Sequence, residues 1–543
     1  MAVGRHAWPT LGGAILCVGL CLVPSAQAER TRLWIDATGR PTPRAWSAIE
    51  MLAHASDDGL DPQRYEAGSL AVRALRLQSA RQVDAAEAAR FESDVTADSV
   101  LFLRHLAFGR VVPSAVGFDL DAPPEWRDLG ALLSWGATEN QLGELVSRLR
   151  SRNVQYEAIR EALAQYRALA ADPACKKPLN ISATIRPGGA LPQASALAAR
   201  LAALGDLDDE TGTPEGRRYS PALVEAVMRF QRRHGLDADG IIGRQTAAAL
   251  DVPIAARQRQ LELALERWRW LPRLDGRVVF INLATFQLWA WDSDTDAPAI
   301  AMPVIAGRPG RFATPVLRTS LRAVELAPYW NIPRSIARDE VLPEIARDPG
   351  KIAREHLEIV LGAGDDAEVM PATRENLELV ERGVLRLRQR PGPDNALGPV
   401  AFSIPNDHGV VLHGTPEIRL FERAQRDFSH GCVRVGDPLG LAEWALAGSD
   451  RWSRARLAAA AQADEPRRIP VPRSIAVVFF YVTAGVDPVT GDVWFRPDLY
   501  GYDAVLERAL ADEAGVVDAS SCEVIPGFAG KPTAPRPAAD RRP

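Results

Sequence analysis

The sequence has 543 residues, of which 47% are hydrophobic and 24% charged, and its formal net charge at pH 7 is -5. A chain of this length usually folds into roughly two to four domains, and its hydrophobic content can fill their cores, which excludes a largely disordered protein. Basic residues are spread along the chain rather than gathered into one block, and this distribution argues against a nucleic-acid partner.

The first 28 residues have the pattern of a secretory signal peptide. Arg5 and His6 precede an apolar run from Leu11 to Val23, and the small-residue site Ala26-Gln27-Ala28 follows. The alternative is a membrane anchor, but this run is shorter than the roughly 20 residues that span a bilayer core. We expect cleavage before Glu29, a periplasmic location, and no stable membrane span afterwards.

Five cysteines are present, and Cys17 and Cys21 lie in the predicted signal peptide. The residues before Cys21 do not fit a lipidation site. Cleavage leaves Cys175, Cys432 and Cys522, and an odd number in an oxidising compartment leaves at least one thiol unpaired. A disulfide between Cys175 and Cys522 is one option that the sequence leaves open.

Residues 29–180 are rich in alanine, arginine and leucine, and their pattern predicts a helical scaffold domain. Phe91, Val95, Phe102 and Leu106 fall on one face of a predicted helix. Little chemistry is visible in this region.

Residues 185–255 have the pattern of a compact three-helix domain. Ser220 and Pro221 are typical of the N-cap and first position of a helix whose residues Leu223, Val227 and Phe230 face inward. The run from Phe230 to Leu236, followed by the turn and helix residues Asp239, Gly240, Gly243, Thr246 and Leu250, resembles the peptidoglycan-binding domain of cell-wall enzymes. The resemblance implies glycan binding; the alternative is a spacer that no longer binds glycan.

A linker helix is expected over 256–275, and a mostly β domain over 276–510. Runs rich in β-branched and aromatic residues predict strands at Arg277–Leu283, Gln287–Trp291, Met302–Ile305, Leu317–Leu326, Leu385–Gln389 and Val410–His413. Helical residues from Ile336 to Val360 interrupt them, and a hairpin from Ile475 to Phe495 is expected to complete the domain. The proline-rich tail 525–543 is predicted to be disordered.

The residues that suggest chemistry are His413-Gly414 and Ser429-His430-Gly431-Cys432. A free thiol is only slightly ionised at neutral pH, so His413 could pair with Cys432 as an imidazolium and later return a proton to a leaving amine. The N–H groups of Gly431 and Cys432 could face a developing oxyanion. Two alternatives stay open on spacing alone: a structural cysteine, and a zinc site with the ligands His408, His413, His430 and Cys432.

The segment from Ser429 to Arg434, together with His413-Gly414, resembles the signature of the YkuD-type L,D-transpeptidase catalytic domain. Other segments resemble the large multidomain Gram-negative branch of that family: Arg267–Pro272, Gln287–Trp289, Pro328–Pro333, Pro391–Pro393, Asn395–Gly398 and Leu499–Gly501. The chain departs from that branch at Gly436-Asp437, where many relatives have asparagine, and at Tyr481–Gly485, where tryptophans are common.

The resemblance implies a multidomain α+β protein with a β-sandwich-like catalytic domain and a helical lid inserted at about 335–390. It implies that Cys432 is the nucleophile and His413 the proton donor and acceptor, with the carbonyl of Gly414 orienting the imidazole. Ser429, His430, Gly431 and Arg434 would support the site and contact substrate. No metal or organic cofactor is expected.

The expected reaction joins two stem peptides of peptidoglycan. Cys432 would form a thioester with a tetrapeptide stem, releasing D-alanine, and a diaminopimelate amine of a second stem would then give a 3→3 cross-link. The expected partners are stem peptides and glycan, with peptidoglycan synthases as further candidates. Two rival functions remain: a hydrolase of the same fold that trims stems or releases wall-bound lipoprotein, and a non-catalytic wall-binding scaffold.

Overall fold

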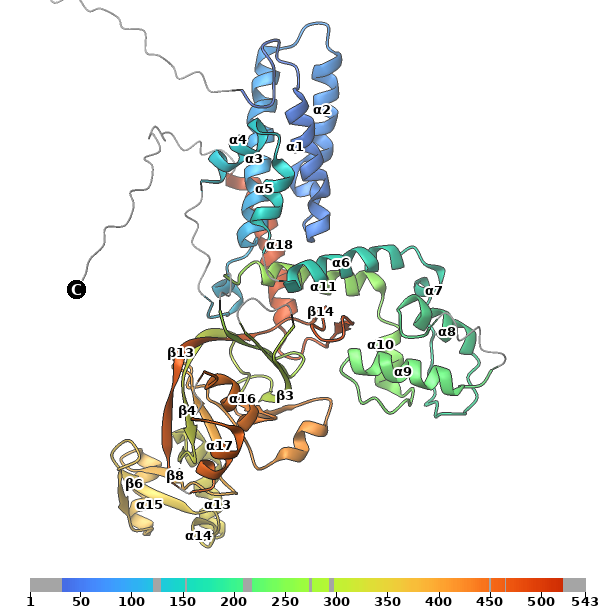
Figure 1. The fold of residues 1–543 in the computed structure, drawn as a ribbon. Coiled ribbons are helices and arrows are strands. Elements are labelled where there is room, and N and C mark those ends of the chain that lie inside the picture. Colours follow the sequence, from blue (N-terminus) through green and yellow to red (C-terminus); the bar gives the residue numbers. More distant parts are fainter. Residues whose placement is uncertain are drawn as a thin grey trace, which may run out of the picture.

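The computed structural model describes residues 32–120, 128–151, 154–208, 217–272, 276–292, 297–448, 451–463 and 465–520. The predicted signal peptide 1–28, the predicted tail 525–543 and Cys522 lie outside these residues. The described chain has a helical N-terminal region and a mainly β region, joined by long helices (Figure 1).

The N-terminal helices pack around a hydrophobic core of their own, which runs from Trp34 to Leu149. Asp84 caps the longest helix by accepting from the N–H of Ala86, and Phe91 lies on its buried face. The sequence prediction of a helical region is confirmed here. The helices are α1 (Pro43–Ala53), α2 (Ala67–Ser79), α3 (Ala85–Phe108), α4 (Leu129–Thr138) and α5 (Leu142–Leu149), with the 3-10 turns η1 (His54–Asp58) and η2 (Pro62–Tyr65).

Three helices connect this bundle to the β region: α6 (Val154–Leu169), α11 (Ile254–Trp268) and α18 (Tyr502–Ser520). They share one hydrophobic core with the large sheet, so α6 packs with the β region although it lies in the predicted scaffold range. The fully buried Arg267 of α11 forms an ion pair of 2.5 Å with Asp503 of α18. This pair ties the C-terminal helix back to the middle of the chain.

A smaller helical unit has its core between Leu179 and Leu250. Ser220 caps α9 by accepting from the N–H of Leu223, as the sequence predicts. The buried amide of Gln231 donates to Asp239, Ile241 and Thr246 and accepts from Gly240, so it fixes the turn that follows α9. The helices are α7 (Pro173–Lys176), α8 (Ala194–Ala203), α9 (Pro221–Arg233) and α10 (Arg244–Leu250).

The β region is built on a nine-stranded sheet in the order β11-β3-β12-β10-β9-β4-β13-β1-β2, and β2 also pairs with β3. The strands are β1 (Val278–Asn282), β2 (Gln287–Trp291), β3 (Ile300–Gly307), β4 (Leu317–Leu326), β9 (Val400–Ser403), β10 (Leu412–His413), β11 (Asp427–Ser429), β12 (Val433–Val435) and β13 (Arg467–Phe480). The expected two-sheet sandwich is therefore one sheet that closes on itself. Closure is achieved because β3 pairs with β2 through residues 300–303 and with β12 through Val304 and Ile305.

Two expected elements differ from the structure. The predicted hairpin from Ile475 is wrong at its start, because residues up to Phe480 extend the long strand β13, and only β14 (Ala484–Val486) and β15 (Val493–Phe495) form the hairpin. The predicted helical run to Val360 ends earlier, since Leu357–Leu361 is strand β6. Leu357 and Ile359 are buried while Glu358 between them is only partly buried, and this alternation is typical of a strand.

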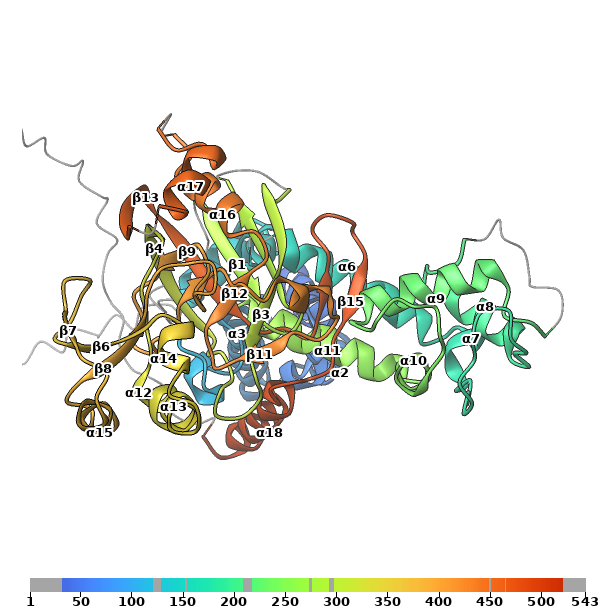
Figure 2. The ribbon, with the colours of Figure 1, turned by 90° about the horizontal axis from the view of Figure 1, so that it is seen from below.

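Residues between Trp330 and Gln389 form an inserted subdomain with its own core and a four-stranded sheet in the order β5-β8-β6-β7. Figure 2 shows this subdomain at the end of the molecule opposite to helices α8–α10. Its elements are β5 (Trp330–Asn331), α12 (Arg334–Ile336), the π-helical turn η5 (Ala337–Val341), α13 (Leu342–Arg347), α14 (Lys351–Arg354), β6, β7 (Glu368–Met370), α15 (Arg374–Arg382) and β8 (Arg386–Gln389).

The remaining elements lie around the sheet and were not predicted: the 3-10 turns η3 (Pro113–Val116) and η6 (Ile418–Glu422), and the helices α16 (Pro438–Ala445) and α17 (Arg454–Ala461). Within the described residues, every helix is too short or too polar to cross a bilayer.

Candidate active site

The parallel pairing of β10 with β12 places His413 and Cys432 on adjacent segments of the sheet, although no hydrogen bond joins their side chains among the described residues. Leu412 pairs with Val433 and His413 with Arg434, and the N–H of Val433 donates to the carbonyl of Val411 at 3.0 Å. The same register places Cys432 opposite Val411. Because residues two apart on a strand share a face, Cys432 is the diagonal neighbour of His413 on one face of the sheet.

His413 is held in one orientation by its own backbone neighbour. Its side chain is 5% exposed, and Nδ1 lies 2.6 Å from the carbonyl oxygen of Gly414. A carbonyl only accepts, so Nδ1 carries the proton and Nε2 is left with its lone pair. Burial, and after it the positive charge of Arg434, lower the pKa of His413 to about 4, against hydrogen bonds to the backbone that raise it.

Cys432 is half-buried, and burial raises the pKa of its thiol, while the backbone of Val411 and the charge of Arg434 act in the opposite direction. A lowered imidazole pKa beside a raised thiol pKa disfavours the predicted thiolate–imidazolium pair at rest. Both shifts favour a neutral thiol and a neutral imidazole at rest. In this form Nε2 of His413 can accept the thiol proton when a substrate carbonyl is attacked.

The loop before Cys432 is fixed by two hydroxyl groups. Ser429 Oγ donates to the carbonyl of Cys432 at 2.5 Å and accepts from the N–H of Gly431 at 3.1 Å. Thr314 Oγ1 donates to the carbonyl of Gly431 at 2.9 Å and accepts from the N–H of Gly307 at the same distance. Gly431 has a φ of 117°, which only glycine adopts without strain.

This arrangement corrects one prediction. The N–H of Gly431 is already donated to Ser429, so it is not free to face an oxyanion in this state. The N–H of Cys432 has no partner among the hydrogen bonds of the described chain and remains the candidate donor.

His430 contacts two residues that the sequence analysis missed. Its Nε2 lies 2.6 Å from Glu340 Oε1, in η5 of the inserted subdomain, and 2.6 Å from Arg308 Nη2. Phe312 packs edge-on against the imidazole at 4.7 Å between ring centroids. Only the basic and aromatic composition of 308–312 could have indicated a role for this segment, because its contacts with His430 depend on the pairing of β3 with β11.

Arg434 lies directly opposite His413 and forms an ion pair with Glu417. Its side chain is 18% exposed. Its positive charge lowers the pKa of both His413 and Cys432.

The zinc alternative is not supported by these positions. His408 Nε2 contacts Asp119 at 2.9 Å rather than joining His413. In the described part of the chain, no group of three or more histidine, cysteine or acidic side chains is arranged to hold a metal ion. Cys175 is buried in α7, and its proposed pairing with Cys522 falls on a residue outside the described chain.

Residues at the two places where the sequence differs from the family that it resembles have structural roles. Asp437 caps α16 by accepting from the N–H of Gly440 at 3.0 Å, and it pairs with Arg454 at 2.8 Å. Tyr481 is fully buried and donates to Asp498 at 2.9 Å. Both residues support the framework rather than the face that carries Cys432.

Replacing Ser429 with alanine should loosen the loop without removing the nucleophile. The change removes one donor and one acceptor from a half-buried turn, and a loss of about 1–3 kcal/mol in stability is expected. Misplacement of Cys432 should lower the acylation rate about tenfold to a hundredfold. Stopped-flow acylation checks this, with Ser79→Ala at the exposed C-terminal end of α2 as the control; equal rates for the two variants would contradict it.

Comparisons with known proteins agree with this architecture. Residues 276–455 match the family model described as the L,D-transpeptidase catalytic domain, YkuD. Residues 192–250 match the model described as "Putative peptidoglycan binding domain", and residues 26–163 match a scaffold domain.

A relative from Haemophilus influenzae, described as "Putative L,D-transpeptidase", is 29% identical over 294 residues. The match covers 53% of this chain and 58% of the relative. A crystal structure of an L,D-transpeptidase from Stackebrandtia nassauensis is similar at 16% identity and a TM-score of 0.22, covering 55% of this chain and 94% of that one.

The domain assignment rests on the family models, which match the segments that carry helices α8–α10 and every strand of the large sheet except β13. The chain thus carries a YkuD L,D-transpeptidase catalytic domain together with a peptidoglycan-binding domain.

Proposed function

We propose that this protein is an exported, periplasmic L,D-transpeptidase that forms 3→3 cross-links in peptidoglycan through a thioester on Cys432. The observation that carries the proposal is the β10–β12 register, which makes Cys432 the diagonal neighbour of a buried, oriented His413. A nucleophile beside a base that is itself oriented by a third group is the arrangement that acyl transfer requires.

The proposed first half-reaction moves one proton and exchanges one bond. As Cys432 Sγ attacks the carbonyl of the third stem residue, Nε2 of His413 takes the thiol proton. The imidazolium then returns that proton to the nitrogen of the departing D-alanine, and the C–N bond breaks. Gly414 keeps Nδ1–H in place throughout, so Nε2 alone exchanges protons.

The second half-reaction resolves the thioester. The side-chain amine of diaminopimelate on a second stem attacks the carbonyl, and Nε2 of His413 removes a proton from that amine. The C–S bond breaks, the sulfur recovers the proton, and the free enzyme is restored with a new amide bond. Water in place of the amine would give hydrolysis instead.

We propose that the inserted subdomain acts as the lid that excludes this water. Its residue Glu340 contacts His430, two residues before the nucleophile. Nε2 of His430 can donate to Glu340 only when it carries a proton, and it can accept from Arg308 only when it does not. It therefore makes one of these two hydrogen bonds at a time. The contact with Glu340 would therefore hold the lid closed when Nε2 carries a proton.

Glu340→Gln should shift the products toward hydrolysis. The variant loses the carboxylate that binds His430, and an exposed pair of this kind contributes about 0–1 kcal/mol, so a change of up to about fivefold is expected. The measurement is the ratio of tripeptide monomer to cross-linked dimer. Glu378→Gln in exposed α15 is the matched control, and an unchanged ratio in both variants would refute the role of Glu340.

The proposed function is tested with purified protein and disaccharide tetrapeptides. Cross-linked dimers analysed by mass spectrometry support transfer, whereas tripeptide monomers alone indicate the rival hydrolase. A carbapenem should also form a covalent adduct on Cys432. Protein that forms neither adduct nor dimer would refute the proposal.

We also propose that helices α8–α10 bind the glycan of the wall and that peptidoglycan synthases are partners. Support comes from the family match of residues 192–250 and from the turn that Gln231 fixes after α9. Pull-down of insoluble peptidoglycan by the wild-type protein and by Gln231→Leu would test glycan binding by this unit.

A further inference from the structure

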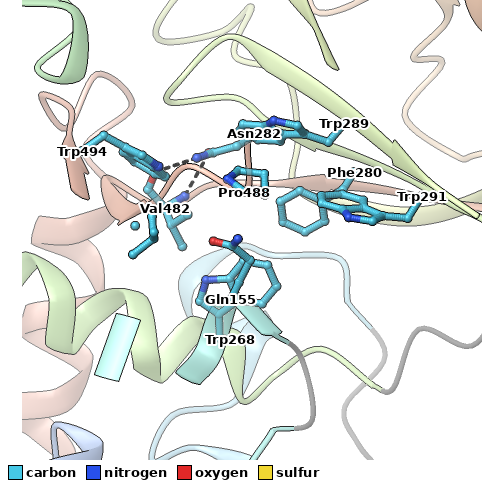
Figure 3. A pocket seen from close by; sticks show the side chains of 11 residues that line it. Gln155, Trp268, Phe280, Asn282, Trp289, Trp291, Val482, Pro488 and Trp494 are labelled. Carbon is cyan, nitrogen blue, oxygen red and sulfur yellow. Dashed lines mark hydrogen bonds between the residues drawn. The ribbon is translucent and has the colours of Figure 1, made fainter. Parts of the chain in front are cut away.

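The tryptophan-lined space in Figure 3 is a void of the hydrophobic core rather than a ligand site. Its volume of about 20 Å³ holds no more than one water-sized group. Trp268 and Phe280 stack in its wall with ring centroids 5.1 Å apart, so these side chains pack the core. Recognition of a larger ligand therefore needs the surface, and the surface beside Cys432 includes the loop of residues 308–313.

Loop 308–313 follows β3 and is fixed at both ends to the segment that carries the nucleophile. At its start, the N–H of Arg308 donates to the carbonyl of Ser429 at 3.0 Å. Just after its end, the fully buried Thr314 donates to the carbonyl of Gly431 at 2.9 Å. A surface loop with both ends fixed keeps its side chains in a set position relative to the nucleophile, as a binding site requires.

The loop presents two arginines that share one aromatic ring. The guanidinium carbons of Arg308 and Arg311 lie 4.7 Å and 4.5 Å from the ring centroid of Phe312. A cation near a phenyl ring is attracted to its face, so the ring serves as a platform for both guanidinium groups. Phe312 also lies against the nucleophile loop, because its carbonyl oxygen would be 3.7 Å from a Cβ atom at Gly431. Two positive charges therefore lie close to the residue that precedes the nucleophile.

Neither arginine is neutralised by an acidic side chain. Arg308 and Arg311 are exposed, and among the described residues they form no ion pair. Only Nη2 of Arg308 is engaged with another side chain through a hydrogen bond, at 2.6 Å from Nε2 of His430. Arg434, by contrast, is already paired with Glu417. Neighbouring positive charges repel each other, and an anion that contacts both arginines would offset this repulsion.

The inserted subdomain faces the same two arginines. Glu340 lies 2.6 Å from Nε2 of His430, the atom that Arg308 also contacts. The pKa of Asp339 is lowered, first by a hydrogen bond from the neighbouring arginine and then by positive charges that include Arg311. The two arginines thus lie where loop 308–313 and the inserted subdomain meet beside the nucleophile.

The proposed substrate carries the anion that guanidinium groups recognise best. Their planar N–H groups bind a carboxylate through parallel hydrogen bonds. A tetrapeptide stem has one carboxylate on its terminal D-alanine and another on the side chain of diaminopimelate. These are the two residues that flank the bond to be broken, so either carboxylate would lie near the nucleophile during the reaction.

We propose that Arg308 and Arg311 form a subsite that binds a carboxylate of the donor stem. The inference rests on the proposed function, because the stem peptide supplies the anion. Binding of this carboxylate holds the scissile bond near Sγ of Cys432. The subsite also sets specificity, since a stem with an amide at the same position loses the charge that the two arginines bind.

Binding is measured in the full chain with the change Cys432→Ala, which removes the nucleophile, and disaccharide tetrapeptide is the probe. Two matched ligands carry an amide in place of the D-alanine carboxylate or in place of the diaminopimelate carboxylate. One of the amides should bind about tenfold more weakly than the acid, the loss expected for a hydrogen bond between charged groups. The amide that loses affinity identifies the carboxylate that is bound.

Arg308→Gln and Arg311→Gln, each added to this background, should weaken binding of the acid about tenfold and leave binding of that amide unchanged. The comparison isolates the contact with the carboxylate, because a merely structural change weakens acid and amide alike. Arg311→Lys keeps the charge and should restore part of the affinity. Arg374→Gln in α15 removes an exposed arginine that pairs with Glu378, and this matched control should bind every ligand as the parent does.

Equal affinity of the acid and both amides for the parent protein would overturn the subsite. Equal losses for acid and amide in both glutamine variants would also overturn it, and would show that the arginines serve only the acidic residues of the inserted subdomain. Acylation of the wild-type protein by the tetrapeptide is measured separately. Acylation without carboxylate-dependent binding overturns the subsite alone, whereas carboxylate-dependent binding without acylation supports the subsite and contradicts the proposed transfer. Thermal unfolding of each variant shows that a loss of binding is not a loss of fold.

Discussion

Replacing Cys432 with alanine is expected to abolish both carbapenem adduct formation and cross-linking, with kcat/KM falling by about 10⁴-fold or more. The acyl group has no other attachment point, since the thioester is formed on the sulfur itself. Cys432→Ser should also be nearly inactive. A hydroxyl is far less acidic than a thiol, and a base with a pKa of about 4 is too weak to activate it.

Intact-protein mass spectrometry and product analysis provide the measurements. Cys175→Ala is the matched control, because Cys175 is buried in α7, which lies apart from β12 in Figure 2. Its activity per folded molecule should equal that of the wild type. A stoichiometric adduct on the Cys432→Ala protein would show that another nucleophile acts, and unchanged cross-linking in cells would favour the non-catalytic scaffold.

Some helices and strands could be predicted from the sequence because the pattern that marks them is local. The Ser220-Pro221 cap gave the start of α9, and the runs Gln287–Trp291 and Leu317–Leu326 coincide with β2 and β4. In each case the signal, which is a helix cap or the hydrophobic pattern of a strand, lies within a few consecutive residues. Such patterns report which face of an element is buried, but not what covers it.

Long-range pairings could not be read in this way. Closure of the sheet depends on β3 pairing with β2 and also with β12 and β11, and the whole inserted subdomain lies between β3 and these last two strands along the chain. The short strands β11 and β12 are stabilised by their neighbours rather than by their own sequence. A buried ion pair between Arg267 and Asp503 joins α18 to α11, and the spacing of residues in the sequence does not predict it.

The candidate site also contains residues that the sequence predicted and residues that only the fold reveals. His413 and Cys432 stand out because a thiol between two histidines in a loop is rare, and their spacing permits them to meet only through folding. Glu340, Arg308 and Thr314 were missed because ordinary polar residues acquire their role from the contact they make. The burial of His413 and Cys432 disfavours the predicted thiolate–imidazolium pair, and residue types alone do not reveal that burial.

His413→Ala should lower kcat/KM by about 10²–10⁴-fold, the usual contribution of a general base, and should change the pH profile. In the wild type the imidazole must be neutral, so with a pKa of about 4 the rate should be constant from about pH 5 to 8 and fall only below about pH 4. In the variant the attacking species is the small thiolate fraction, which rises tenfold per pH unit below the raised pKa of Cys432. The profile should therefore slope upward across the range where the wild type is flat.

Carbapenem acylation rates across this pH range distinguish the neutral dyad from a resting ion pair. His408→Ala is the matched control, because His408 contacts Asp119 rather than the site, and it should keep the flat profile. Thiolate ultraviolet absorbance at neutral pH, compared between the wild type and Cys432→Ala, provides a second measurement. Full absorbance at neutral pH would mean that the proton already rests on His413, and His413 would then act first as the acid toward the leaving amine. The neutral dyad instead requires that absorbance appear only as the pH approaches the raised pKa of the thiol, because nothing removes its proton until substrate is attacked.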